Sequence, residues 1–322
     1  MLFSVIIASK LNQTVYTNLY LSLVIILLHC SMRSLFLFLI LNFEGLRAST
    51  SAQVRISDSI IRKNNNSGVT ALPGANVNIT RTNFNDNVGG DYGGGAIYSQ
   101  HANILVQKSK FTRNIGSGKI GGALLCSDKS SCILESCEFS NPMPIDPALT
   151  LATKGAAITV DRSHSVIRQC LFEHLHSTTG GALSVSSFGT VKVIETVFRN
   201  NQGSEGSAIY MEDSTVHVLK STFEGNIATY DGGAMRVSRS SLILNDTKIR
   251  NNEAGSSGGG VALSLDGKSN IKSEWRACIA YMEKHCSFDF YFSPLFQTYF
   301  IVLVTYLLYS KTPIQVFFFL TQ

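Results

Sequence analysis

The sequence is poor in charged residues and lacks any cluster of basic side chains. Asp, Glu, Lys and Arg make up 15% of the 322 residues, and the formal net charge is only +5. No run of Lys and Arg is interleaved with aromatic residues, which is the pattern typical of nucleic-acid-binding surfaces. We therefore expect no nucleic-acid partner.

Metal-ligand patterns are missing as well. The chain has seven cysteines, but no Cys-x-x-Cys pair and no matched pair of histidines. Such spacings are what place ligands around a zinc ion. We therefore expect no metal and no other cofactor. The cysteine content instead fits a protein of an oxidising compartment.

What the chain does have is a repeat of about 26 residues, a period that indicates a solenoid or an array. It runs from near Val54 to near Leu263, and each copy carries a motif of the type Phe-x-x-Asn. The first position of this motif is occupied in turn by Ile61, Phe84, Phe111, Phe139, Phe172, Phe198, Phe223 and Ile249. Asn follows three residues later in six of these eight copies.

Each copy can be divided into three strands. Aliphatic residues recur seven and five positions before the aromatic, which is the period of a strand. The alternation of inward and outward positions then shifts by one residue at a small residue two positions before the aromatic. One strand therefore ends there and a second begins. A Gly-Gly-Ala-Ile type motif starts the third strand, at Gly94, Gly121, Gly155, Gly180, Gly206 and Gly232.

Three strands and three turns per copy make one coil of a parallel β-helix. The predicted fold is therefore all-β, a solenoid of about eight coils. A disordered Gly/Ser/Asn-rich segment would not need aligned aliphatic positions. Because successive coils lie about 4.8 Å apart, equivalent residues should stack. We expect an internal Phe stack, an Asn column at one turn and glycines at positive φ.

The alternating Gly-Gly-Ala-Ile and Phe-x-x-Asn motifs resemble the repeats of the bacterial polymorphic outer-membrane protein family. More broadly, they are similar to the right-handed parallel β-helices of the pectin-lyase-like superfamily. The resemblance covers residues 49–267 and implies a right-handed helix in a secreted or surface-exposed domain used in adhesion. Residues 268–322 lack the alternating strands of that family's translocator, so only the fold is carried over.

Residues 1–48 are expected to be a signal peptide or an uncleaved signal anchor. Apolar runs cover 19–28 and 35–41, and both are expected to be helical. A true start at Met32 would give a complete signal peptide, with a basic start, an apolar middle and cleavage near Ala48. If the two runs join, they are long enough to span a membrane. A core helix of a soluble domain is the plainer alternative.

The composition changes after Gly267. A degenerate last coil is expected, with Ser273 and Trp275 in the small and aromatic columns. Residues 288–309 are apolar and long enough for a membrane-spanning helix. Three interpretations of 268–322 stay open, namely a membrane anchor, a hydrophobic cap over the last coil and an artefact of the gene model.

Four cysteines are candidates for disulfides. Cys137 and Cys170 occupy the same column in consecutive coils, so their Cα atoms should lie about 4.8 Å apart, within disulfide range. Cys126 and Cys132 end one strand and start the next, and a bond between them would close the turn. Alternatively, all four are small buried apolar residues.

Three sequons lie within the repeats, at Asn65, Asn78 and Asn245. In a secreted protein they are candidate N-glycosylation sites on turns or outer faces. Asn78 and Asn245 are adjacent to core positions, which makes them weaker candidates than Asn65.

Pectin-degrading enzymes also have this fold, and their groove usually lies on the outward side of the third strand. Asp161 and Glu212 share a column there, two coils apart, so about 9–10 Å separates their Cα atoms. That is near the carboxylate separation of inverting glycosidases. They are weak catalytic candidates, because solvated acids at strand ends explain them more simply and pectinase signatures are missing.

Tyr98, Tyr210 and Arg236 share another outward column of the third strand and form a candidate ligand surface for sugars. Ordinary exposed strand residues are the alternative. The lack of a dense acidic patch favours binding over catalysis. The sequence thus predicts a secreted or cell-surface β-helix, tethered to a membrane if its terminal segments insert. It would act in adhesion or as a structural or binding surface for polysaccharides or surface proteins. A polysaccharide-active enzyme is the alternative.

Overall fold

A computed structural model of the chain describes residues 45–49, 51–90, 93–116, 120–141, 155–263 and 270–274, the last range in backbone only. The described part contains strands and no helix. The predicted terminal helices and the residues on both sides of Met32 lie outside it, as do Trp275 and the apolar tail. One strand, Leu46–Ala48, lies before the expected start of the repeat domain at residue 49, and another, Asn270–Glu274, lies in the expected degenerate last coil.

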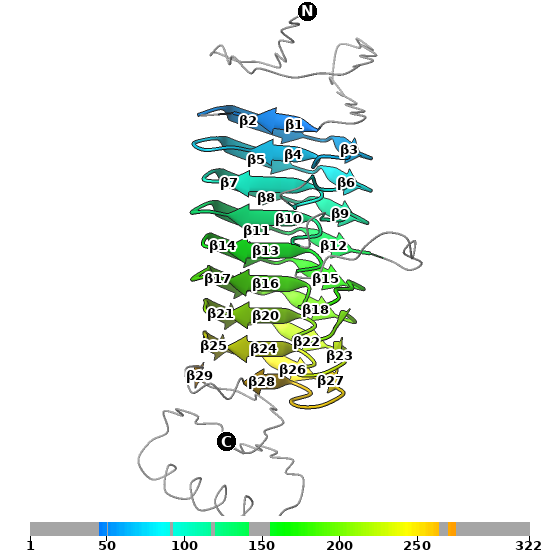
Figure 1. Cartoon of the computed structure of the whole chain (residues 1–322), viewed down its shortest axis with the longest axis vertical. Helices are drawn as coiled ribbons and strands as arrows, with labels where there is room; N and C mark the ends of the chain where they lie inside the picture. Colours follow the sequence, from blue (N-terminus) through cyan, green and yellow to red (C-terminus); the bar gives the residue numbers. More distant parts are fainter. Residues whose placement is uncertain are drawn as a thin grey trace, which may run out of the picture.

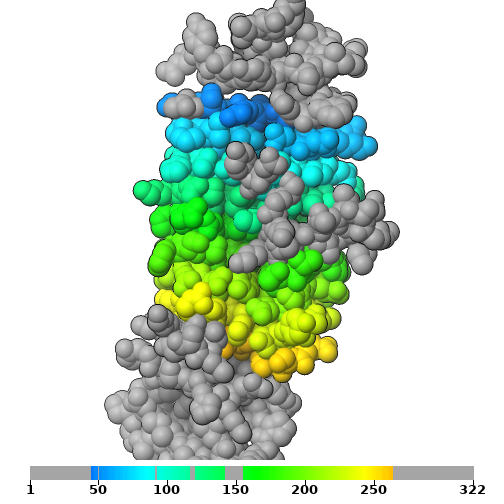
Figure 2. Space-filling model, in the orientation of Figure 1, coloured from blue at the N-terminus to red at the C-terminus, as the bar shows by residue number. Residues whose placement is uncertain are grey.

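The strands form a parallel β-helix in which each turn of the chain adds one strand to each long sheet (Figure 1). Sheet 1 consists of β1 (Leu46–Ala48), β4 (Val69–Ala71), β7 (Ile97–Gln100), β10 (Leu124–Ser127), β13 (Ile158–Asp161), β16 (Leu183–Ser186), β20 (Ile209–Glu212), β24 (Met235–Ser238) and β28 (Val261–Leu263). In the space-filling view the coils follow one another along a rod (Figure 2).

Two further long sheets and one short sheet complete the coils. Sheet 2 consists of β2 (Gln53–Ser57), β5 (Asn76–Thr80), β8 (Asn103–Gln107), β11 (Ser131–Glu135), β14 (His164–Arg168), β17 (Thr190–Ile194), β21 (Thr215–Leu219), β25 (Ser241–Asn245) and β29 (Asn270–Glu274). Sheet 3 consists of β3 (Ile60–Arg62), β6 (Asn83–Asn85), β9 (Lys110–Thr112), β12 (Glu138–Ser140), β15 (Leu171–Glu173), β18 (Val197–Arg199), β22 (Thr222–Glu224) and β26 (Lys248–Arg250). The short sheet consists of β19 (Gln202–Gly203), β23 (Ile227–Ala228) and β27 (Glu253–Ala254).

The predicted columns are confirmed by the register of sheet 3. Six phenylalanines stack from Phe84 to Phe223, with consecutive ring centroids 4.5–4.9 Å apart and ring planes within 7° of parallel. Ile61 and Ile249 continue the column at its two ends. All eight side chains are buried, and each buried phenyl ring contributes about 1.5–3 kcal/mol of apolar burial.

The asparagine column is a buried hydrogen-bond ladder. Asn201 Nδ2 donates to Asn226 Oδ1 at 2.9 Å, and Asn226 Nδ2 donates to Asn252 Oδ1 at 2.8 Å. The same amides also donate to backbone carbonyls, such as that of Phe172 at 3.1 Å from Asn201 Nδ2. A buried amide is costly unless it is bonded, and the asparagine on the next coil supplies that bond. Asn64, Asn87 and Asn114 form a second ladder of the same kind, and two coils without asparagine at this position separate the two ladders.

The turn between sheets 2 and 3 has a left-handed residue in every coil, and none of these residues is glycine. Their φ angles are 47–54°, at Asp58, Arg81, Lys108, Ser136, Gln169, Glu195, Lys220 and Asp246. The next residue, in the small column, compensates for the strain: Thr196 Oγ1 donates to Ile194 O at 2.9 Å, and its backbone N–H donates to Ser221 Oγ at 3.2 Å. The small column thus closes the turn by hydrogen bonds as well as leaving room for the phenyl ring.

The expected register of the last coil is wrong. Ser273 pairs with Leu244 in β25, so it lies in the aliphatic column five residues before the aromatic. The degenerate sequence after Val261 has no Phe-x-x-Asn motif from which to count, so the expected alignment rests on Ser273 and Trp275 alone.

Removing one ring from the phenylalanine stack should destabilise the solenoid strongly. We expect Phe172→Ala to lower the free energy of unfolding by about 3–5 kcal/mol, because both ring contacts and apolar burial are lost. Leu171→Ala is the matched control, since Leu171 lies on the same strand with its side chain half-buried. Denaturant unfolding followed by circular dichroism measures both. A loss for Phe172→Ala no larger than for Leu171→Ala would contradict the stacked core.

Candidate functional site

The outward column of sheet 1 runs from Thr70 through Tyr98, Leu125, Thr159, Ser184, Tyr210 and Arg236 to Ala262. The register therefore aligns Tyr98, Tyr210 and Arg236 as predicted. Their exposure differs from the prediction, however. Tyr98 and Tyr210 are 7% and 9% exposed, so neither ring is available to stack on a sugar.

Glycine-rich segments of the preceding turn cover this column. A Cβ atom on Gly180 would lie 2.8 Å from Tyr210 Cγ, and one on Gly206 would lie 2.9 Å from Arg236 Cβ. The absence of a side chain at both glycines thus lets the backbone pack against the outward residues. Gly206 also has a positive φ of 53°. The sequence motif indicated the positive φ, but not the cover over the sheet.

Arg236 and Tyr210 lie among acidic side chains. The Arg236 guanidinium is 3.8 Å from Glu205 and 3.9 Å from Asp231, and its side chain is 18% exposed. Burial, with smaller contributions from Glu212 and Glu205, raises the pKa of Tyr210 to about 12. The phenol therefore stays protonated at neutral pH and is not a general base there.

The two candidate catalytic carboxylates are each bound to an arginine. Arg162 Nη2 is 3.1 Å from Asp161 Oδ2, and Ser186 Oγ donates to Asp161 Oδ1 at 3.0 Å. Arg239 Nη2 donates to Glu212 Oε1 at 2.7 Å. Both carboxylates are therefore engaged in ion pairs with arginines of the turns.

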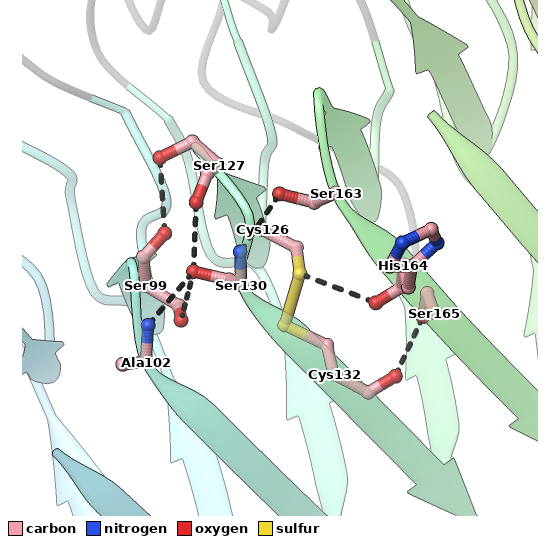
Figure 3. Close-up of a disulfide and its surroundings, with 9 residues drawn as sticks. All are labelled: Ser99, Ala102, Cys126, Ser127, Ser130, Cys132, Ser163, His164 and Ser165. Atoms are coloured by element: carbon pink, nitrogen blue, oxygen red, sulfur yellow. Dashed lines mark hydrogen bonds between the residues drawn. A yellow bond between two sulfur atoms is a disulfide. The ribbon is translucent and has the colours of Figure 1, made fainter. Parts of the chain in front are cut away.

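The structure contains a disulfide between Cys126 and Cys132 (Figure 3). It connects the end of β10 to the start of β11, with 6.4 Å between the Cα atoms. In the turn that it closes, Ser130 Oγ donates to Ser127 O at 2.7 Å, and Ser130 N donates to Ser163 Oγ of the next coil at 3.1 Å.

The predicted bond between Cys137 and Cys170 is not formed, and both thiols are free and buried. In-register neighbours have parallel Cα–Cβ bonds, so their Cβ atoms stay near the strand spacing of about 4.8 Å, too far for a disulfide. Cys137 N instead lies 3.4 Å from Cys170 Sγ, in the turn arrangement of the small column. Contact with Cys137, together with burial, raises the pKa of the Cys170 thiol.

The three sequons differ in accessibility. Asn65 is exposed in a turn, whereas Asn78 is half-buried within β5. Asn245 ends β25, and its Oδ1 atom is buried without a hydrogen-bond partner among the described residues. Asn65 is therefore the sequon whose side chain is most open to modification.

Sequence reasoning missed Phe188, which is 85% exposed and lies between Asp161 and Glu212 along the chain. It falls outside the repeat columns because its turn has an inserted residue. The detectable signal was the longer spacing between the two neighbouring strands: β16 and β17 are separated by three residues, β13 and β14 by two.

Comparison with known families decides the handedness of the coils. Residues 122–275 match the family described as "Right handed beta helix region". The solenoid is a right-handed parallel β-helix. The predicted right-handed parallel β-helix is thereby confirmed, while the likeness to the pectin-lyase-like superfamily and to polymorphic outer-membrane protein repeats stays a resemblance of motifs.

Two individual proteins are similar to the chain. Over 123 residues, 38% of the chain, it is 28% identical to metabotropic glutamate receptor-like protein R of Dictyostelium discoideum, and the match spans 7% of that protein. The crystal structure of endo-xylogalacturonan hydrolase from Aspergillus tubingensis matches 73% of the chain and 85% of its own chain, with 11% identity and a TM-score of 0.27. No activity is inferred from a likeness this remote.

The described ranges contain no group of three or more His, Cys, Asp or Glu side chains that could hold a metal ion. The same ranges include no helix long and apolar enough to cross a membrane.

A second turn should accept the same disulfide. Val185 and Val191 stack two coils below Cys126 and Cys132, and they have the same sequence separation of six residues. We expect the double variant Val185→Cys, Val191→Cys to form a new disulfide in air, as shown by mass spectrometry of unreduced peptides.

The coil between these two supplies the control. Val160 and Ser165 occupy the same columns but are separated by one residue fewer, so Val160→Cys, Ser165→Cys should oxidise more slowly and less completely. Two reduced thiols at 185 and 191, or equal oxidation of both variants, would contradict this account of the turns.

Proposed function

We propose that the protein is a secreted or cell-surface β-helix that binds polysaccharides or protein partners on its outer faces and has no catalytic activity. The observation that carries this proposal is the use of the acidic side chains. Carboxylates on the outer faces and turns are paired with Lys or Arg of a neighbouring coil, as in Asp58–Arg81, Asp86–Arg113, Lys110–Glu138, Asp128–Arg162, Glu173–Arg199, Asp213–Arg239 and Glu224–Arg250. These acidic side chains thus form ion pairs between neighbouring coils of the fold.

The shape of the rod supports a binding role. Sheet 2 has nine parallel strands, so its outer face is about 38 Å long at a strand spacing of 4.8 Å. Side chains on it recur at that spacing in straight columns. Extended surfaces of this kind are what repeat proteins use to hold long or broad ligands.

The disulfide supports the proposed location. Disulfides persist in secreted and surface proteins and are rare in the cytosol, and Cys126–Cys132 closes a surface turn. A surface location also fits the name of the receptor-like relative, although only 7% of that protein is matched.

The competing function is a polysaccharide-active enzyme. It is favoured by one observation: Asp161 and Glu212 end strands two coils apart in sheet 1, which places their Cα atoms about 9.6 Å from each other. The arginine bound to each carboxylate argues against this function.

Binding and hydrolysis can be measured side by side. We expect the purified protein to bind a polysaccharide on a glycan array, or a protein ligand from an extracellular panel, and to release no reducing ends from polygalacturonate or xyloglucan. Asp161→Asn serves as the variant that tests the hydrolytic alternative. Hydrolysis by the wild type that disappears in Asp161→Asn would replace the binding role with the enzymatic one.

A further inference from the structure

Phe188 has an unfavourable conformation and an unfavourable environment at the same time. Its side chain is 85% exposed, and its φ is 66°. It follows Ser187 (φ 52°) in a turn closed by a hydrogen bond from Gly189 N to Ser186 O at 2.9 Å. Positive φ at both central residues is typical of a type I′ turn, where Gly, Asn and Asp are preferred.

Nothing in the fold requires an aromatic side chain there. The turn at Asp128 and Lys129 has the same length and the same pair of positive φ angles, 50° and 63°, with a lysine in the equivalent place. Positive φ is common among the turn residues of this solenoid, where Arg, Lys and Glu adopt it as well. What distinguishes this turn is therefore its phenyl ring, which is exposed to solvent.

Two similar charged clusters flank this ring. On one side, Arg162 is 2.6 Å from Asp128 Oδ1 and 3.1 Å from Asp161 Oδ2. On the other, Arg239 is 2.7 Å from Glu212 Oε1 and 2.8 Å from Asp213 Oδ1.

The turns carrying these clusters are joined to that of Phe188 by the backbone. Arg162 N donates to Ser186 O at 3.4 Å, and Phe188 N donates to Asp213 O at 2.6 Å. Each cluster has two carboxylates and one guanidinium, so each carries a net charge of −1. We call Phe188 together with these two clusters the Phe188 ridge.

We propose that the Phe188 ridge is a docking site for a protein partner that receives the phenyl ring in an apolar pocket rimmed by Lys or Arg. This inference rests on the proposed binding function and assigns it a place and a partner class. Exposed aromatic anchors of this kind carry a large share of the binding energy in protein interfaces. The net negative clusters complement a basic rim and repel an acidic polysaccharide such as polygalacturonate.

The test uses the full chain and a phage library of random 16-residue peptides as the probe. We expect selected peptides to combine aliphatic or aromatic residues with Lys or Arg, and to bind the wild type more weakly as salt is raised. Phe188→Gly should weaken their binding by about tenfold or more. Lys129→Gly relaxes the equivalent turn without removing an aromatic ring and should not weaken binding.

Thermal unfolding separates a binding role from a structural one. Because glycine accepts positive φ without strain, both variants should unfold at or above the wild-type temperature. If Phe188→Gly unfolds several degrees lower while Lys129→Gly does not, the ring belongs to the core of the fold and the proposal fails.

The remaining outcomes are decisive as well. Peptides that bind Phe188→Gly as tightly as the wild type, acidic peptides, or no enrichment would overturn the ridge but leave binding at other faces intact. Loss of glycan binding in Phe188→Gly would assign the ridge to a carbohydrate, and loss of self-association in sedimentation would assign it to a second copy of the chain. Hydrolysis of polysaccharide would instead remove the binding function on which the proposal rests.

Discussion

The structure depends on one constraint, the parallel hydrogen bonding of each coil to the next in strict register. In sheets 1 to 3, a residue lies about 4.8 Å from its equivalent in the neighbouring coil. The side chain at each position must therefore pack against the equivalent side chain of the next coil. Phenylalanine meets this demand by stacking, with centroids 4.5–4.9 Å apart. Asparagine meets it because one amide donates to the next. Small hydroxyl residues meet it by accepting an N–H from one coil while closing their own turn.

The same constraint shapes the outer surface. Like charges one rung apart would repel, so opposite charges alternate, as in the column Glu173, Arg199, Glu224 and Arg250. Surface ion pairs of this kind contribute little individually, about 0–1 kcal/mol, but they use the acids that an active site would need. The turn that holds Phe188 has an inserted residue and presents a large apolar side chain to solvent.

The periodic part of the structure was predictable from the sequence, and the aperiodic part was not. Repeat spacing placed the phenylalanine and asparagine columns correctly, because a residue type that recurs in six of eight copies can be aligned without a template. The Cys126–Cys132 contact followed from the same alignment. The failures have local causes: parallel Cβ directions keep Cys137 and Cys170 apart, a glycine of the preceding coil packs against Tyr210, and Ser273 lies where no motif marks the register. None of these follows from spacing alone, because each depends on side-chain direction or on a neighbouring turn.

The most direct test of register stacking is the removal of one whole coil. Deleting 198–222 takes out 25 residues, the separation between Asn201 and Asn226, and brings Phe172 next to Phe223. Since a solenoid coil contacts only its neighbours, the shortened chain should fold, and its crystal structure should show those two rings stacked about 4.5–4.9 Å apart, as in the full chain. A deletion of about half that length from the same point should not fold. If both deletions fold equally well or fail equally, the columns do not hold the structure together.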